Sequence, residues 1–349
     1  MNEHFIKNIE IKNFKCFKDF KAEGFGRVNL IGGKNNVGKT AFMESCYLIS
    51  NLSNVISEHP TFTYNYGASK IEREWLYFEM IKSLIIVEQN RKNTDFLIEW
   101  IKDEFELNTF GFFEIILNDK YKITLEDNTL MPEYKYRNWS NYGSALLSQY
   151  RENKYLYQIH KKNNPPQINN STFMSPCSSN HSNLINMIDT LKIEGKYDSI
   201  NQLFSQIFKI EKVDVIKNKV MLEQDNKFKD LNDFGDGLKQ FLNIMLALLV
   251  NKDKVIYLDE IGNGIHYTLL DKLWEEILTI SKRQNVQIFA TTHSKECIES
   301  YARVAKRLKD EEIAFLDMGR KKDGSVAMIT MTSKQFQDEI NMTNEVRGW

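Results

Sequence analysis

The sequence predicts an α/β protein with a mixed, largely parallel sheet and an α-rich insertion. Two stretches carry this prediction: an apolar strand run that enters a glycine-rich turn and a helix near residue 33, and an alternation of helices and strands between residues 238 and 308. Strands that alternate with helices are typical of parallel sheets. Between these stretches the pattern changes to amphipathic pieces and an asparagine-rich segment at residues 163–170, which indicates an insertion.

The elements follow from the apolar pattern in chain order. Residues 5–31 alternate as strands, and a helix is predicted from Thr40 to about Ser50. Its expected buried face consists of Phe42, Met43, Cys46, Tyr47 and Ile49. Within the insertion the pattern predicts amphipathic pieces at 75–87 and 95–105, a β piece at 112–125, a helix at 199–208 and an alternating stretch at 213–222. The last third predicts helices at 238–249, 267–281, 295–308 and from 333, and strands at 255–258, 286–290, 313–316 and 326–331.

Length and composition exclude several classes of protein. The chain has 349 residues, enough for about two domains, and 46 basic against 47 acidic residues give a net charge of -1. No overall basic field therefore attracts nucleic acid or an anionic membrane. No apolar run approaches the ~18 residues of a membrane span, and the first ten residues do not resemble a secretory signal, so we expect a cytoplasmic protein with no membrane partner. The four cysteines lack paired spacing, which favours buried free thiols.

A glycine-rich motif lies between the first predicted strand and helix. It fits G-x-x-x-x-G-K-[ST], whose backbone N–H groups surround phosphates, whose lysine bridges the β and γ oxygens and whose hydroxyl reaches magnesium. The motif and the residue that follows it predict nucleotide binding by Gly33, Lys34, Asn35, Asn36, Val37, Gly38, Lys39, Thr40 and Ala41.

Three further segments end or begin at the same predicted edge of the sheet. The apolar run at 255–258 ends in Asp259 and Glu260, which suggests that Asp259 holds magnesium through water and that Glu260 polarises the attacking water. One unit later the strand at 286–290 is followed by His293, which could contact the γ-phosphate and the water. A glycine turn with Gly235, Asp236, Gly237 and Lys239 leads into a helix and is a second candidate anion site, although such turns are more often helix caps.

Taken in order, these segments carry a family resemblance. The stretches IKNFKCFKDF, GGKNNVGKT, GDGLKQFLNI, VIYLDEIGNGIHYTLL and QIFATTHSKECIES resemble ABC-type ATPases of the AAA family that belong to the overcoming-lysogenization-defect (OLD) group, which are distant relatives of SMC head domains. The resemblance covers about residues 1–50 and 230–310. It implies an ABC-type P-loop ATPase head, with Walker A at 33–40, a signature-like turn at 235–239, Walker B at 259–260 and a switch histidine at 293.

The resemblance also implies an assembly and a division of the chain. In such heads two protomers enclose two ATP molecules, and each signature turn faces the γ-phosphate bound by the other protomer, so a dimer or higher oligomer is expected. Residues 1–53 would form the N-terminal half of the head with Walker A. Residues 54–229 would form the insertion and connecting part, and 230–349 the C-terminal half with the signature turn, Walker B and the histidine loop.

Two departures from the family pattern bear on activity. Relatives usually have an acidic residue where this chain has Gly262, so hydrolysis is expected to be slow. OLD proteins proper also carry a C-terminal TOPRIM nuclease with a D-x-D set of metal ligands, whereas the 39 residues after residue 310 contain no D-x-D. The chain therefore resembles stand-alone ATPases that work beside a separately encoded effector in bacterial anti-phage systems.

We thus expect an ATPase that uses ATP and Mg²⁺, with Lys39, Glu260 and His293 as catalytic residues and Thr40 and Asp259 as metal ligands. Its expected role is a sensor or regulatory scaffold for an effector, a nuclease in the first instance, in anti-phage defence. Two alternatives remain: an ATP-dependent DNA-binding repair or recombination factor, and a structural protein that binds ATP with little turnover.

Two surface features leave nucleic acid open as a partner. Arg303, Lys306, Arg307 and Lys309 form a basic helix face, for which a solvated face is the alternative to a DNA contact. Tyrosines between residues 134 and 157 alternate with basic residues, a composition that suits either base stacking or packing within the insertion.

Overall fold

The computed structural model describes residues 5–47, 171–174 and 181–342, together with the backbone of three strands between residues 112 and 161. The chain forms two compact units. The first consists of Met1–Glu23, Thr40–Ser171 and Arg320–Ala327, and the second of Gly24–Lys39, Thr172–Gly319 and Met328–Trp349. The amphipathic pieces expected at 75–87 and 95–105, the asparagine-rich segment and the tyrosine-rich stretch lie outside the described residues. The division at residues 53 and 229 stays a prediction.

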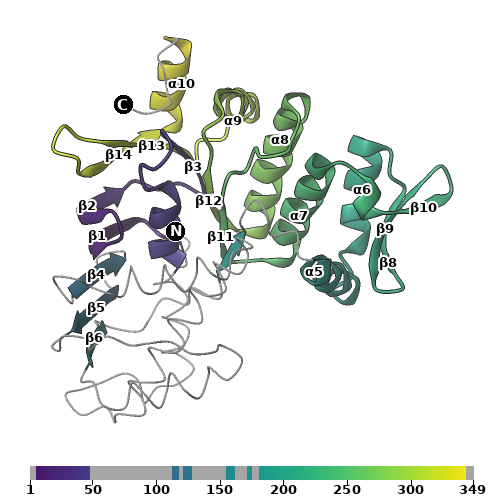
Figure 1. Cartoon of the computed structure of the whole chain (residues 1–349). Coiled ribbons are helices and arrows are strands. Elements are labelled where there is room, and N and C mark those ends of the chain that lie inside the picture. Colours follow the sequence, from purple (N-terminus) through teal and green to yellow (C-terminus); the bar gives the residue numbers. More distant parts are fainter. Residues whose placement is uncertain are drawn as a thin grey trace. The chain divides into compact units, whose positions relative to one another are not determined.

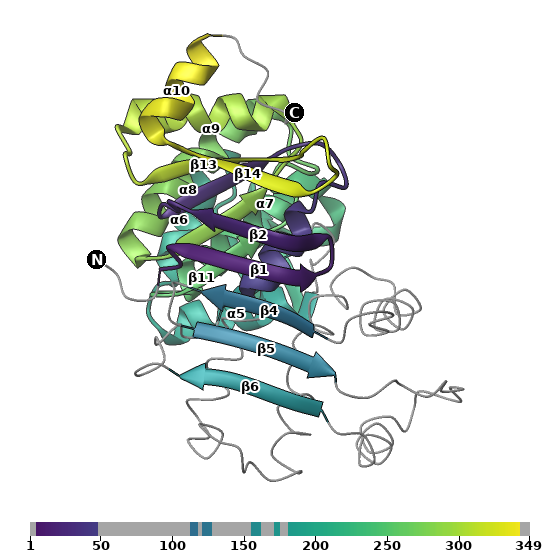
Figure 2. The ribbon, with the colours of Figure 1, turned by 90° about the vertical axis from the view of Figure 1, so that its left-hand side faces the viewer.

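The first unit contains an antiparallel sheet with the strand order β2-β1-β4-β5-β6, and Figure 2 shows these strands side by side. They are β1 (Asn8–Phe14), β2 (Phe17–Glu23), β4 (Phe112–Leu117), β5 (Tyr121–Asp127) and β6 (Tyr155–Lys161). The β piece expected at 112–125 is confirmed as the hairpin of β4 and β5, in which Phe112 pairs with Glu126 and Leu117 with Tyr121. β6 was not predicted from the sequence.

A helix begins at Lys39 and covers residues 39–47 of the described chain. Four of the five residues expected on its buried face are buried, namely Phe42, Met43, Cys46 and Tyr47, and Ile49 lies outside the described residues. Within the first unit Glu44 accepts a hydrogen bond from Lys15 Nζ at 2.7 Å, and both side chains are at least nine-tenths buried. A charge this deep is stable only when paired, so the pair fixes the β1–β2 turn to the helix.

The second unit contains a six-stranded sheet with the order β14-β13-β3-β12-β11-β7. Its strands are β3 (Val28–Gly32), β7 (Thr172–Met174), β11 (Val255–Leu258), β12 (Gln287–Thr291), β13 (Ile313–Arg320) and β14 (Val326–Thr332). The pairs β11–β7, β11–β12, β12–β3 and β13–β3 are parallel, so the expected largely parallel sheet is confirmed. β3, β11 and β12 are buried along their whole length, so their sequences are mostly apolar and do not alternate. Asn29, Gln287 and Thr291 are the buried polar exceptions.

Helices cover this sheet and close the core. α7 (Asp236–Val250), α8 (Tyr267–Gln284) and α9 (Lys295–Leu308) lie side by side (Figure 1), and α10 (Ser333–Asn341) packs against α9. One apolar cluster joins these helices to the strands, with Trp274, Tyr301 and Phe336 among its fully buried side chains. Burial raises the pKa of the Cys297 thiol to about 12. Cys46 and Cys297 are buried free thiols, as expected, and Cys16 is half-buried.

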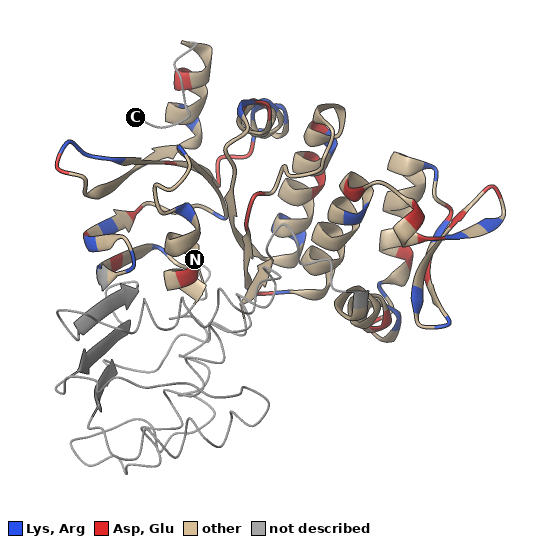
Figure 3. Ribbon diagram, viewed as in Figure 1, with Lys and Arg blue, Asp and Glu red and all other residues tan. Residues whose placement is uncertain are grey.

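A smaller group of elements precedes α7 in the second unit. It comprises α5 (His181–Ile193), α6 (Tyr197–Phe208), a three-stranded antiparallel sheet of β8 (Lys212–Ile216), β9 (Lys219–Gln224) and β10 (Lys227–Asp230), and the short 3-10 helix η4 (Leu231–Asp233). Both signs of charge mark the three strands (Figure 3), and Lys192 and Lys212 each contact Asp214 at 2.7 and 2.9 Å. Basic and acidic side chains are therefore mixed on the surface of β8, β9 and β10.

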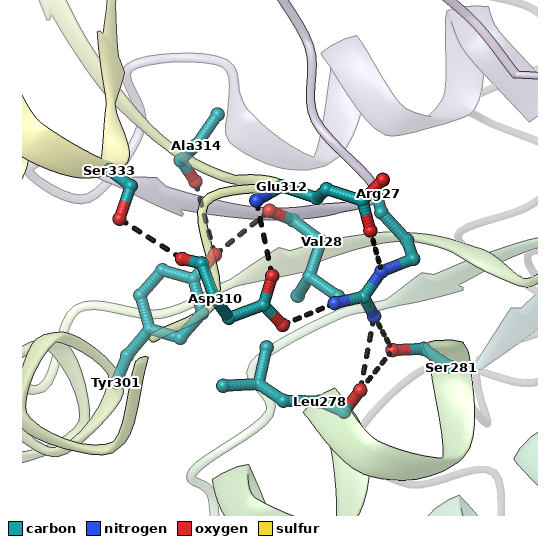
Figure 4. A network of polar contacts seen from close by, with 9 residues as sticks. All are labelled: Arg27, Val28, Leu278, Ser281, Tyr301, Asp310, Glu312, Ala314 and Ser333. Carbon is teal, nitrogen blue, oxygen red and sulfur yellow. Dashed lines mark hydrogen bonds and ion pairs between the residues drawn. The ribbon is translucent and has the colours of Figure 1, made fainter. Parts of the chain in front are cut away.

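A buried polar network closes the sheet at the ends where β3 and β13 begin (Figure 4). Arg27, immediately before β3, is 4% exposed and donates to the Asp310 carboxylate and the Ser281 hydroxyl. It also donates to Leu278 O at 3.1 Å and Glu312 Oε2 at 3.2 Å. One guanidinium thus ties β3 to α8 and to the turn between α9 and β13.

Candidate functional site

The phosphate-loop motif lies between β3 and the helix that begins at Lys39, as the sequence predicts. Gly33 and Gly38 have φ values of +136° and +110°, and Asn36 has +60°. Glycine adopts such angles without strain. A side chain at Gly33 would also meet the carbonyl oxygen of Met318 on β13, so the first position of the loop accepts only glycine.

Lys39 fills the interior of its own loop. Its Nζ donates to the carbonyl oxygens of Gly33 and Lys34, both at 2.9 Å, and the residue is 7% exposed. Burial lowers the pKa of this ammonium group, while the charges of Glu260 and Asp259 oppose that change. The two carboxylates are therefore near enough for their field to act on the loop lysine.

Asp259 follows β11 directly and is 8% exposed. Its backbone N–H donates to Met174 O on β7 at 2.8 Å, and its Oδ1 accepts a hydrogen bond from the Thr291 hydroxyl at 2.6 Å. Contacts to the strands on both sides thus fix the residue at the carboxyl end of the sheet.

Glu260 and His293 form a pair across the ends of β11 and β12. His293 Nδ1 lies 2.8 Å from Glu260 Oε2, and the side chains are 59% and 27% exposed, respectively. Glu260 has a φ of +51°, a region that non-glycine residues rarely adopt and that clusters at functional sites. Glu260 thus combines an unusual backbone conformation with a partly exposed carboxylate, the group type that can act as a general base.

The glycine turn at 235–237 packs against the loop that follows Glu260. Gly235 caps α7, and a Cβ at Gly237 would lie 2.5 Å from Gly264 O, so the backbones touch. Asp236 is 89% exposed and lies 3.3 Å from Lys239 Nζ. A Cβ at Gly262, where relatives carry a third acid, would lie 3.4 Å from Cys297 Sγ, an ordinary contact distance.

Two of the four basic residues on the α9 face form ion pairs within the second unit. Arg303 donates to both oxygens of Asp271 at 2.5 and 2.9 Å, and Arg307 lies 3.4 Å from Glu275 on α8. These pairs favour the interpretation of a solvated helix face over that of a DNA contact.

The second unit brings the phosphate loop, Lys39, Asp259, Glu260 and His293 together at the carboxyl ends of β3, β11 and β12. Thr40 and Ala41 are half-buried residues in the first turn of the helix after the loop. Among the described residues no group of three or more His, Cys, Asp or Glu side chains gathers to hold a metal ion. No helix of the described chain is long and apolar enough to span a bilayer.

Two buried polar residues on β12 and β13 are not among the candidates that the sequence predicts. Thr291, the last residue of β12, is fully buried and contacts Asp259. Asp317 lies on β13 and pairs in register with Gly32 of β3. It is 8% exposed, and its Oδ1 has no hydrogen-bond partner. The run Ile-Ala-Phe-Leu-Asp at 313–317 has the same signal as Asp259, an apolar strand that ends in a carboxylate, and could have revealed the second of them.

The parallel sheet, its helices and the glycine loop that precedes Lys39 are those of a P-loop ATPase. The chain matches the family described as "AAA domain, putative AbiEii toxin, Type IV TA system" over residues 28–299. The protein belongs to this AAA family.

Individual relatives agree with this assignment. A Helicobacter pylori protein named ATP/GTP phosphatase is 27% identical over 331 residues, which cover 84% of this chain and 86% of the relative. A stretch of 45 residues, 13% of this chain and 12% of the relative, is 42% identical to the DNA replication and repair protein RecF of Clostridioides difficile. A crystal structure of an SMC head bound to the C-terminal winged-helix domain of ScpA matches with a TM-score of 0.51 at 11% identity, over 94% of this chain and 98% of that chain. The last match supports the ATPase-head fold.

Proposed function

We propose that the protein binds Mg-ATP at its phosphate loop and hydrolyses it to ADP and phosphate. The observation that carries this proposal is the convergence of a buried loop lysine, two carboxylates whose charges act on it, and a histidine hydrogen-bonded to one of them. The AAA family assignment and the similarity to a protein named ATP/GTP phosphatase support the same conclusion.

Lys39 is the proposed phosphate ligand. Its ammonium donates to two loop carbonyls, and β- and γ-phosphate oxygens at the loop would attract it more strongly than these carbonyls because they are charged. The backbone N–H groups of residues 33–41 complete the phosphate site.

Glu260 is the proposed general base. Its Oε2 accepts a hydrogen bond from His293 Nδ1 at 2.8 Å, which leaves Oε1 to take the proton of the attacking water. His293 fixes the orientation of the carboxylate, and in its imidazolium form, in which both ring nitrogens carry a proton, Nε2 can donate to the γ-phosphate. A general base positioned in this way accounts for about 10²- to 10⁴-fold of a rate.

The residues at this edge fit a magnesium ion of the nucleotide-bound type. Mg²⁺ is usually held by one or two carboxylates together with substrate phosphates and water, and the buried Asp259 carboxylate is one such ligand. The loop motif assigns the Thr40 hydroxyl to the same ion. When bound, the ion neutralises charge on the phosphates during transfer.

We further propose that two protomers enclose the nucleotides. Gly235, Asp236, Gly237 and Lys239 would reach the γ-phosphate bound by the other protomer, and the high exposure of Asp236 at the start of α7 supports an intermolecular role. The ATP-loaded dimer, or a higher oligomer, would then act as a sensor or regulatory scaffold for a separate effector, a nuclease, in anti-phage defence of the OLD-like type. The toxin and type IV toxin-antitoxin system in the family description support a role in bacterial defence.

The test combines ATP turnover with solution mass for the wild type and Glu260→Gln, with and without Mg-ATP. We expect turnover in the wild type, none in Glu260→Gln, and a larger Mg-ATP-dependent assembly of the variant. Glu299→Gln is the matched control, because it neutralises a carboxylate of α9 that pairs with Lys295 Nζ at 3.5 Å one helical turn away. Turnover by Glu260→Gln at the wild-type rate would contradict the assignment of the base.

The same preparation distinguishes the alternatives. A DNA affinity that rises with ATP and falls steeply with salt would favour the repair factor, to which the short match with RecF points. ATP binding and assembly without turnover in the wild type would favour a structural ATP-binding protein.

A further inference from the structure

Thr291 lies at the junction of the two strands that carry the proposed catalytic groups. It is the last residue of β12 and is 0% exposed. Its Oγ1 lies 2.6 Å from Asp259 Oδ1 and 2.8 Å from the backbone N of Glu260. One hydroxyl therefore contacts both members of the acidic pair.

The two contacts require opposite roles of the hydroxyl. A threonine hydroxyl offers one hydrogen and accepts through its lone pairs. It donates its hydrogen to the Asp259 carboxylate, which can only accept, and accepts the N–H of Glu260. Valine, which has nearly the same shape, can make neither bond, whereas serine can make both.

The backbone of Thr291 adds a third bond to the same segment. Its carbonyl oxygen accepts the N–H of Ile261 at 3.0 Å. Thr291 therefore forms a hydrogen bond with each of the three consecutive residues 259–261. The middle residue, Glu260, has a φ of +51°. Such a conformation persists only where the surroundings determine it, so the Thr291 hydroxyl is part of what keeps Glu260 in it.

We propose that Thr291 is a positioning residue that aims the metal-binding carboxylate of Asp259 and the base Glu260 together. This inference rests on the proposed function of the two acids. Because Thr291 is 0% exposed, it acts through its hydrogen bonds and not by contact with substrate. Hydrogen-bond partners of metal-bound groups typically contribute about 10- to 100-fold to activity or metal affinity.

The test compares Thr291→Val, which keeps the shape, with Thr291→Ser, which keeps the hydroxyl. We expect Thr291→Val to lower kcat by about 10- to 100-fold and to raise the Mg²⁺ concentration needed for half-maximal rate. The KM for ATP should change by less than about threefold, because the phosphate loop is intact. Thr291→Ser should retain most of the wild-type kcat.

Thr172→Val is the matched control. Thr172 lies on β7, an edge strand of the same sheet, and its hydroxyl donates to Asn251 Oδ1 at 3.1 Å. The variant therefore measures the effect on kcat of losing a strand hydroxyl that contacts neither Asp259 nor Glu260. If kcat falls equally in Thr172→Val and Thr291→Val, general destabilisation explains the loss, and the proposal is overturned. Equal losses in Thr291→Ser and Thr291→Val would do so as well, since shape would then matter and not the hydroxyl.

The outcomes separate this inference from the proposed function. No turnover by the wild type would overturn the proposed function, and the positioning role with it. Turnover by the wild type and an unchanged kcat in Thr291→Val would overturn the positioning role alone. If Thr291→Val does not fold, Thr291→Cys, with its weaker hydrogen bonds, should still lower kcat, and a wild-type kcat in that variant would also refute the role.

Discussion

Replacing Asp317 by asparagine should stabilise the protein at neutral pH and do so less at acidic pH. Asp317 is 8% exposed, and its Oδ1 has no hydrogen-bond partner. Burial raises the pKa of this carboxyl from 3.8 to about 6, because the charged form loses water and gains nothing in exchange. Asparagine has nearly the same shape and carries no charge at any pH.

The magnitude follows from the two pKa values. The folded state binds the proton more tightly than the unfolded state, so Asp317 lowers the free energy of unfolding as pH rises from about 3.8 to about 6. With about 1.4 kcal/mol for each tenfold difference in proton affinity, the cost is about 1.6 kcal/mol at pH 5.0 and about 3 kcal/mol at pH 7.5. The advantage of Asp317→Asn over the wild type should therefore grow by about 1.4 kcal/mol between these pH values.

Urea unfolding of both proteins at pH 5.0 and 7.5 measures this difference. Any constant penalty from burying the asparagine amide cancels, because only the change with pH is compared. Asp323→Asn is the control: hydrogen bonds from the hydroxyl and the N–H of Ser325 lower the pKa of Asp323, so its titration lies below the measured window and its effect should be the same at both pH values. A pH-independent difference between Asp317→Asn and the wild type would refute the reasoning.

Two further predictions follow from buried contacts. Arg27→Met should lower the free energy of unfolding by about 3–5 kcal/mol, because it leaves the Asp310 carboxylate buried without its partner; urea unfolding measures this, and Arg27→Met combined with Asp310→Leu should recover much of the loss. An unchanged unfolding midpoint in Arg27→Met would contradict the network drawn in Figure 4. Gly33→Ala should weaken nucleotide binding at least about tenfold, since alanine at a positive φ is strained and its Cβ meets Met318 O. Titration with a fluorescent ATP analogue tests this, and wild-type affinity would show that the loop can change its shape.

The elements that could be predicted from the sequence are those whose own residues determine them. The strand at 255–258 and the helix at 295–308 have the predicted bounds, because each is an apolar run or an apolar helical period that ends in polar residues. β7 could not be predicted, since three residues carry no period. It exists because Thr172–Met174 pair with β11, a partner about eighty residues away.

The same distinction applies to the candidate site. Spacing within one segment predicts the phosphate loop and the acids after β11, since the chemistry requires those residue types next to one another. Thr291 belongs to the same polar cluster as His293 but could not be given a role, because a buried threonine at a strand end is ordinary until the neighbouring strand brings Asp259 within 2.6 Å. The positive φ of Glu260 likewise occurs where its N–H donates to Thr291 of the neighbouring strand, a contact that spacing within one segment does not reveal.

Polar residues of the second unit lie at both ends of its parallel strands. We expect those where the strands begin to contribute to the free energy of unfolding, and those where the strands end to contribute to the reaction. At the ends where strands begin, Arg27 donates to two segments, α8 and the turn before β13, and is only 4% exposed. At the ends where they finish, Glu260 and His293 remain partly exposed to meet a ligand. Loss of Arg27 should therefore lower the unfolding midpoint while the folded fraction keeps its kcat, whereas loss of the Thr291 hydroxyl should lower kcat by more than its effect on stability explains. Opposite behaviour of the two variants would mean that the ends of the sheet are energetically coupled through the strands between them.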